Sequence, residues 1–191
     1  MVDEVHIAII GVGNLEVGPP LMATIAQYFG ERPLAIRLYD PNHEIAELIG
    51  LLAKALFNVT DSVHILGVFE DYCEALAGAH GVIFCPDYPG EELWTKHHPD
   101  FPEKKGFADA VLSQANDAVS VINLTDDYDD MRMREWGPWP GFLEEDALDE
   151  MPHQILRWIH DDDSPHELLD ANKISPFREW IEEICVNLAS D

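Results

Sequence analysis

The segment VHIAIIGVGN at residues 5–14 constrains the fold of this chain most. A short β-branched apolar run such as VHIAII is typical of a strand that is buried on both faces of a parallel sheet. Gly11 allows a tight bend out of that strand, and Gly13 allows backbone N–H groups to approach a bound group closely. The segment therefore predicts a first strand and a glycine turn of the kind that holds a pyrophosphate.

The next hundred residues alternate between apolar runs and amphipathic segments. Pro19 and Pro20 open a helical segment that ends at Gly30. Residues 86–106 are rich in Pro, Gly, His and acids and predict a loop. Such alternation predicts an α/β fold, a Rossmann-type doubly wound parallel sheet with helices on both faces. Strands are expected at 5–10, 34–40, 63–69, 82–85 and 118–124, and helices at 19–30, 43–58, 72–79 and 107–117.

The composition changes after residue 125. The segment TDDYDDMRMREWGPWPG is first acidic and then aromatic and rich in Pro and Gly, which predicts an irregular connector. Ser164-Pro165 and Ser175-Pro176 each combine a helix cap with proline at the first helical position. We therefore expect a Rossmann-type dinucleotide-binding domain over residues 1–130 and an acidic connector with a small helical C-terminal extension, or subdomain, over residues 131–191.

The charge of the chain limits its partners. Only 11 Lys and Arg stand against 37 Asp and Glu, and the formal net charge is -26. A basic surface for nucleic acid or for an anionic membrane is hard to assemble from this composition. No apolar run approaches the roughly 20 residues that span a bilayer, and the N-terminus carries acids where a signal peptide carries cations. We expect a soluble cytoplasmic protein without nucleic-acid or membrane partners; homo-oligomerisation stays open.

Cysteine and histidine give weaker signals. Cys73, Cys85 and Cys185 lie in apolar stretches without a C-x-x-C pair, which predicts buried thiols in a reducing compartment. His97 and His98 are expected on a surface loop, and no metal site is expected. If the chain is catalytic, one of these two histidines is the best candidate for a general acid or base.

Asp40 is the expected partner of the glycine turn. It ends the second strand, where a carboxylate can accept hydrogen bonds from adenosine ribose hydroxyls. Asp40 follows Gly13 by 27 residues, longer than the usual spacing of about 20. Glu16 stands at the third position of G-x-G-x-x-G, with Gly18 two residues later, and its carboxylate would repel a pyrophosphate. The alternative is that the glycines serve only close packing.

Together, IAIIGVGN, LAIRLYDPN, EDYCEALAGAHGVIFC and SVINLTDD resemble the N-terminal NAD-binding domain of the family 4 glycosidases, which are related to lactate and malate dehydrogenases. The resemblance covers residues 5–126. It implies an NAD site at Gly11, Gly13, Asn14 and Asp40, with Asn123 near the nicotinamide.

The sequence departs from this family at several positions. Asn14 replaces the serine after the second glycine, and Asp126-Asp127 replaces Asn-Pro after the fifth strand. The segment CPDYPGEELWTKHH lacks the arginine of the family's substrate loop. We expect the catalytic C-terminal domain to be absent, since only 65 residues follow Asp126.

The sequence therefore predicts an NAD(P)-binding Rossmann-fold protein of uncertain activity. It could be an oxidoreductase or a glycosidase-like relative that acts on a small hydroxy, carbonyl or sugar compound. A substrate would then lie near Asp87, His97 and Asp126. The alternative is a non-catalytic nucleotide-sensing or assembly module that retains only the fold. A third reading is a domain that binds another adenine nucleotide, or none.

Overall fold

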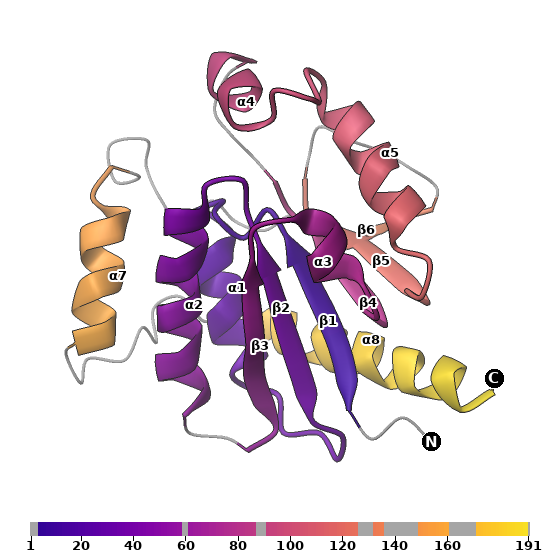
Figure 1. The fold of residues 1–191 in the computed structure, drawn as a ribbon. Helices are drawn as coiled ribbons and strands as arrows, with labels where there is room; N and C mark the ends of the chain where they lie inside the picture. The colour runs from indigo at the N-terminus through magenta and orange to yellow at the C-terminus, as the bar shows by residue number, and fades with distance from the viewer. Residues whose placement is uncertain are drawn as a thin grey trace.

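The computed structural model describes residues 4–58, 61–86, 91–125, 132–135, 149–160 and 171–190. Within these ranges the strands form one six-stranded sheet in the order β3-β2-β1-β4-β5-β6, with every neighbouring pair parallel (Figure 1). The expected doubly wound parallel sheet is thereby confirmed. The strands are β1 (Val5–Ile10), β2 (Leu34–Tyr39), β3 (Val63–Phe69), β4 (Gly81–Phe84), β5 (Ser120–Asn123) and β6 (Arg134–Glu135).

Each face of the sheet has its own hydrophobic core. In β1, Ile7 and Ile9 belong to one core and Ala8 and Ile10 to the other, because successive side chains of a strand point to opposite faces. On the first face lie α1 (Gly18–Ile25), α2 (His43–Phe57) and α8 (Ala171–Ser190). The second core takes residues from α3 (Tyr72–Leu76), α4 (Glu91–His97) and α5 (Lys104–Gln114). Figure 1 shows α7 (Met151–His160) beside α2.

Two helices begin at the side-chain caps that their sequences carry. The Asn42 side chain accepts a hydrogen bond from the Ile45 amide at the start of α2. The Asp71 carboxylate accepts one from the Cys73 amide at 2.9 Å and starts α3. Each cap satisfies one of the amide groups that a first helical turn leaves without a backbone partner.

Residues 86–106, expected to form a loop, contain α4. The helix buries a single large side chain, Trp94, whose indole Nε1 donates to the Phe101 carbonyl at 2.7 Å. A helix of seven residues with one buried position shows almost no apolar periodicity, so the sequence did not predict it. Similarly, α1 ends at Ile25 instead of continuing to Gly30.

The C-terminal helix contains a second correction. We expected a helix to begin at Ser175-Pro176, but α8 begins at Ala171 and continues through Pro176. Pro176 lies in the second turn, where its ring removes one amide from the ladder. Burial of Phe177, Trp180 and Ile181 on the first face offsets that loss.

Some expectations fall outside the described ranges. These are the Ser164-Pro165 cap and most of the irregular connector predicted after residue 125. The division into residues 1–130 and 131–191 stays a prediction. None of the helices in the described ranges is long and apolar enough to cross a lipid bilayer.

Candidate functional site

The predicted site lies where β1, β2 and β4 end. Gly11 follows β1, Asp40 follows β2 and Cys85 follows β4, and the three strands are adjacent and parallel. The Tyr39 carbonyl at the end of β2 accepts hydrogen bonds from the Gly11 and Val12 amides at 2.8 and 3.2 Å. Since β2 and β4 flank β1 on opposite sides, the strand order reverses here. Open α/β sheets bind their ligands in the crevice at such a reversal.

The Asp40 carboxylate is bonded to the glycine turn. Its Oδ2 accepts a hydrogen bond from the Gly13 amide at 2.8 Å, and its Oδ1 accepts one from the Asn42 amide at 2.9 Å. The residue is 1% exposed. A Cβ atom at position 13 would lie 2.5 Å from the Asp40 Cγ, so only glycine permits this approach.

The other two glycines of the motif also permit close contacts within the protein. Gly11 has φ of +90°, and a Cβ atom there would lie 2.3 Å from the Cα and N atoms of Pro86. A Cβ atom at Gly18 would lie 2.3 Å from the Val12 carbonyl oxygen. Each glycine of the motif therefore has a packing reason that is independent of any ligand.

Asn14 ties the turn to the end of β4. Its Nδ2 donates to the Cys85 carbonyl at 3.1 Å, and its Oδ1 accepts from the Glu16 amide at 3.2 Å. The Asn14 backbone carbonyl accepts from the Gly18 amide at 2.7 Å and from the Val17 amide at 3.2 Å. The side chain and backbone of Asn14 thus hold the connection between β1 and α1 in one conformation.

Cys85 and Pro86 are neighbours of the site that sequence reasoning did not assign to it. The sequence signal for these two residues was their position directly after β4, which is the other strand adjacent to β1. The Cys85 thiol lies 3.5 Å from the Gly11 carbonyl oxygen. Burial, and to a lesser degree the negative charge of Asp40, raise the pKa of the Cys85 thiol. It is a neutral packing group, as predicted, whereas Cys73 and Cys185 are only half-buried.

Asn123 lies apart from the other predicted residues. It ends β5, which β4 separates from β1. Its Oδ1 accepts hydrogen bonds from the amide and the hydroxyl of Thr125 at 2.9 and 2.7 Å. The structure thus gathers Gly11, Gly13, Asn14 and Asp40, and places Asn123 two strands away along the same edge.

The expectation that His98 lies on a surface loop is wrong. His98 follows α4 and is 3% exposed. Its ring stacks on Trp94 at a centroid distance of 3.9 Å and lies 4.7 Å from the Phe107 ring. Burial lowers the pKa of His98 to about 4, so the ring is neutral at pH 7. Burial and the Lys96 charge also lower the pKa of His97. Both pKa values are shifted away from neutral pH, which weakens both residues as candidates for a general acid or base.

The other two positions expected near a substrate, Asp87 and Asp126, lie outside the described residues. Among the residues that the structure describes, no cluster of three or more His, Cys, Asp or Glu side chains could hold a metal ion.

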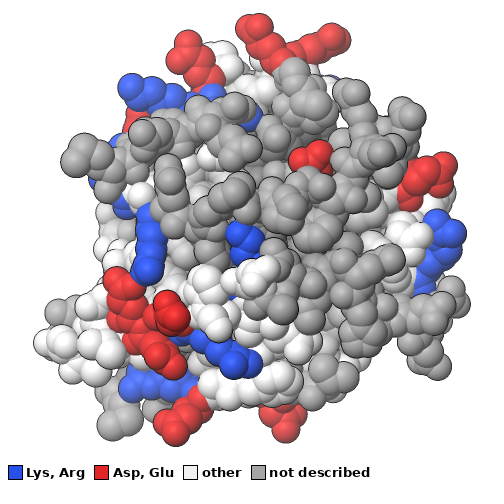
Figure 2. Space-filling model, turned by 180° about the vertical axis from the view of Figure 1, so that it is seen from behind, with Lys and Arg blue, Asp and Glu red and all other residues white. Residues whose placement is uncertain are grey.

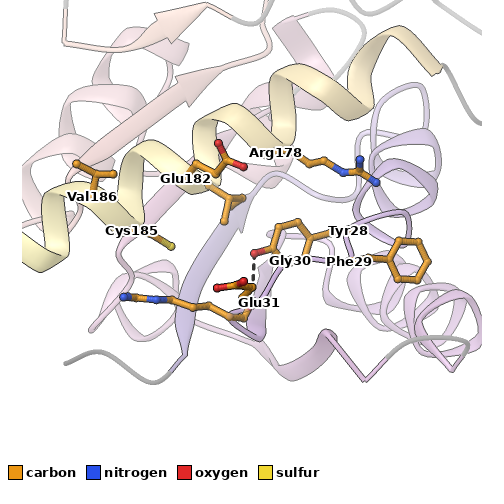
Figure 3. A pocket seen from close by; sticks show the side chains of 10 residues that line it. Tyr28, Phe29, Gly30, Glu31, Arg178, Glu182, Cys185 and Val186 are labelled. Atoms are coloured by element: carbon orange, nitrogen blue, oxygen red, sulfur yellow. Dashed lines mark hydrogen bonds between the residues drawn. The ribbon is translucent and has the colours of Figure 1, made fainter.

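A pocket of about 670 Å³ lies elsewhere, before the start of β2. Figure 3 shows side chains from two segments around it, the connection between α1 and β2 and the helix α8. The Tyr28 hydroxyl donates to the Arg32 carbonyl at 3.2 Å, and Arg178 donates to the Gln27 carbonyl at 3.0 Å. The second of these bonds ties α8 to the connection between α1 and β2. The pocket is lined by Tyr28, Phe29, Gly30, Glu31, Arg32, Arg178, Ile181, Glu182, Cys185 and Val186.

Charged residues of both signs share the surface. On the described part of the face in Figure 2, Lys and Arg lie among Asp and Glu. Arg132 pairs with Asp109 at 2.8 Å, and Arg134 pairs with Glu183.

Comparison with known proteins relates the chain to solved structures by its fold. No protein-family model and no curated protein matches the sequence. A 6-phospho-α-glucosidase from gut microorganisms, solved with NAD and Mn²⁺, superposes with a TM-score of 0.53 at 15% identity, covering 69% of this chain and 38% of that one. Another 6-phospho-α-glucosidase from gut microorganisms, solved with NAD and glucose-6-phosphate, gives 0.51 at 14% identity and covers 66% and 35%. This chain therefore spans little more than a third of their length and shares their Rossmann-type fold.

Proposed function

We propose that this chain binds NAD at the carboxyl ends of β1 and β2. One observation carries the proposal. A buried carboxylate, that of Asp40, touches the amide of Gly13 at the point where the strand order reverses. A ribose hydroxyl can both accept from an amide and donate to a carboxylate, so it would replace the direct bond between these two groups and bridge them. The solved structures with the same fold contain NAD, which supports this choice of ligand.

The residues at the site fit the adenosine half of NAD best. Asp40 would hold the ribose, and the missing Cβ of Gly13 is what brings the turn amide next to the carboxylate. NAD bound at this edge would supply a hydride acceptor. The reaction would be hydride transfer or glycosidase-like chemistry on a small hydroxy, carbonyl or sugar compound. Either reaction would need a general acid or base other than His97 and His98.

The test is a calorimetric titration of the full chain with NAD⁺. We expect saturable heat, and a weaker affinity by about tenfold in Asp40→Asn, which loses the charged acceptor while keeping its shape. Asp71→Asn is the matched control, because Asp71 likewise caps an amide but at the start of α3. No heat at millimolar NAD⁺, or equal weakening in both variants, would exclude the site.

A second function has its own observation. Every glycine of the turn is explained by a contact within the protein, and Asp40 already has amide partners. This favours the non-catalytic module, in which the turn is a closed structural element. That reading predicts no NAD⁺ heat, together with a loss of stability in Asp40→Asn of about 1–3 kcal/mol.

A further inference from the structure

The amides of the glycine turn are engaged by the protein itself. The Gly11 and Val12 amides donate to the Tyr39 carbonyl, and the Gly13 amide donates to Asp40. A turn that cradles a pyrophosphate offers such amides to the phosphate oxygens instead. In this structure all three donors have acceptors within the protein.

The amides that lead into α1 are engaged as well. The Asn14 amide donates to the Gly11 carbonyl at 3.1 Å. The Glu16 amide donates to the Asn14 side chain, and the amides of Val17 and Gly18 donate to the Asn14 backbone carbonyl. These bonds form an additional turn between the glycine motif and the helix.

The start of α1 is poor in donors by composition. Pro19 and Pro20 occupy its first turn and have no N–H group. The next amide, Leu21, donates to the Val17 carbonyl. Within residues 11–20, Leu15 contributes the one remaining amide. The partial positive charge of a helix N-terminus acts through such free amides, so little of it is available here.

The charges at the site also disfavour a phosphate. Residues 11–20, 40–42 and 85–86 contain two carboxylates, Glu16 and Asp40, and no Lys or Arg. A pyrophosphate adds two negative charges, and the chain as a whole carries -26. The negative charges of the whole protein repel the negative phosphates, and added salt reduces that repulsion.

We infer that this site recognises the nucleoside and not the phosphates: adenosine would supply most of the affinity, and a pyrophosphate would add little. The inference rests on the proposed function, since it concerns the ligand of the same site. Ribose recognition would exchange one bond, that between the Gly13 amide and Asp40, whereas pyrophosphate recognition would also require breaking the bonds made by Asn14.

The decisive experiment compares adenosine, AMP, ADP and NAD⁺ in calorimetric titrations of the full chain. We expect dissociation constants within about tenfold of one another across the series. Tighter binding of ADP and NAD⁺ than of adenosine by more than about a hundredfold would overturn the inference and leave the proposed NAD site standing. No binding of any of the four would overturn the proposed function itself.

A charge variant makes the test independent of absolute affinity. Glu16→Gln removes one repelling charge beside the turn, so NAD⁺ affinity should rise by about two- to fivefold while adenosine affinity stays unchanged. Glu31→Gln removes the same charge beside the distant pocket and serves as the control. Raising NaCl from about 50 to about 500 mM should not weaken NAD⁺ binding. Weakening by salt would show an attractive phosphate site and refute the inference. An equal response of both variants would show that Glu16 has no local effect on the phosphates, and it would refute the inference as well.

Discussion

Gly11→Ala tests the contact that closes the glycine turn against β4. At φ of +90° an alanine costs about 1–2 kcal/mol, because its Cβ approaches its own backbone. The new Cβ would also lie 2.3 Å from two backbone atoms of Pro86, which a rotamer change cannot relieve. Forced displacement of packed atoms costs about 1–3 kcal/mol more. We therefore expect the free energy of unfolding to fall by about 2–5 kcal/mol.

Gly78→Ala is the matched control for that prediction. Gly78 also has a positive φ, +72°, but nothing lies within 4 Å of its Cβ position. Its alanine variant should lose only the conformational part, about 1–2 kcal/mol. Urea unfolding followed by tryptophan fluorescence measures both variants. Equal losses in the two would mean that Pro86 moves away freely, and the account of Gly11 as a packing glycine would be refuted.

Two further predictions concern pH and salt. The pKa of His98 is about 4 in the folded protein and 6.5 in an unfolded chain, so the unfolded state binds the proton first and stability falls as the pH drops from 6.5 toward 4. Melting temperatures between about pH 7 and pH 5 should fall less steeply in His98→Gln than in wild type, and parallel curves would contradict a buried neutral ring. Because the net charge is -26, added NaCl should raise the melting temperature at pH 7, and a falling temperature would contradict net repulsion.

The alternation of strands and helices was predictable because it depends on local patterns. The run at 5–10 lies buried in β1 over the expected residues, and the run at 34–40 ends one residue early. The helix α4 could not be predicted, since its one buried side chain, Trp94, packs against Phe107 of another helix. His98 lies four residues after Trp94, and only the unpredicted helix α4 brings the two rings together.

The candidate site was predictable in position and not in its bonding. Strand ends placed Gly11, Gly13 and Asp40 together, because parallel strands end at a shared edge. The direction of the Asp40 carboxylate depends on a contact across 27 residues, which no local pattern encodes. Asn14 is similar, since its side chain reaches the end of β4.

The packing of α8 on the sheet affects how fast this chain can fold. Gly81 of β4 lies beneath Ile184 and Trp180 of α8 and beside Ile7 of β1, and the Trp180 indole donates to the Ser120 hydroxyl at 2.9 Å. The first strand is thus covered by residues that follow it by more than 170 positions. Contacts of such long sequence separation close large loops and slow folding. During synthesis, the part of the first face around Ile7 and Gly81 stays uncovered by α8 until the residues near 184 have emerged, so an early intermediate exposes apolar sheet there.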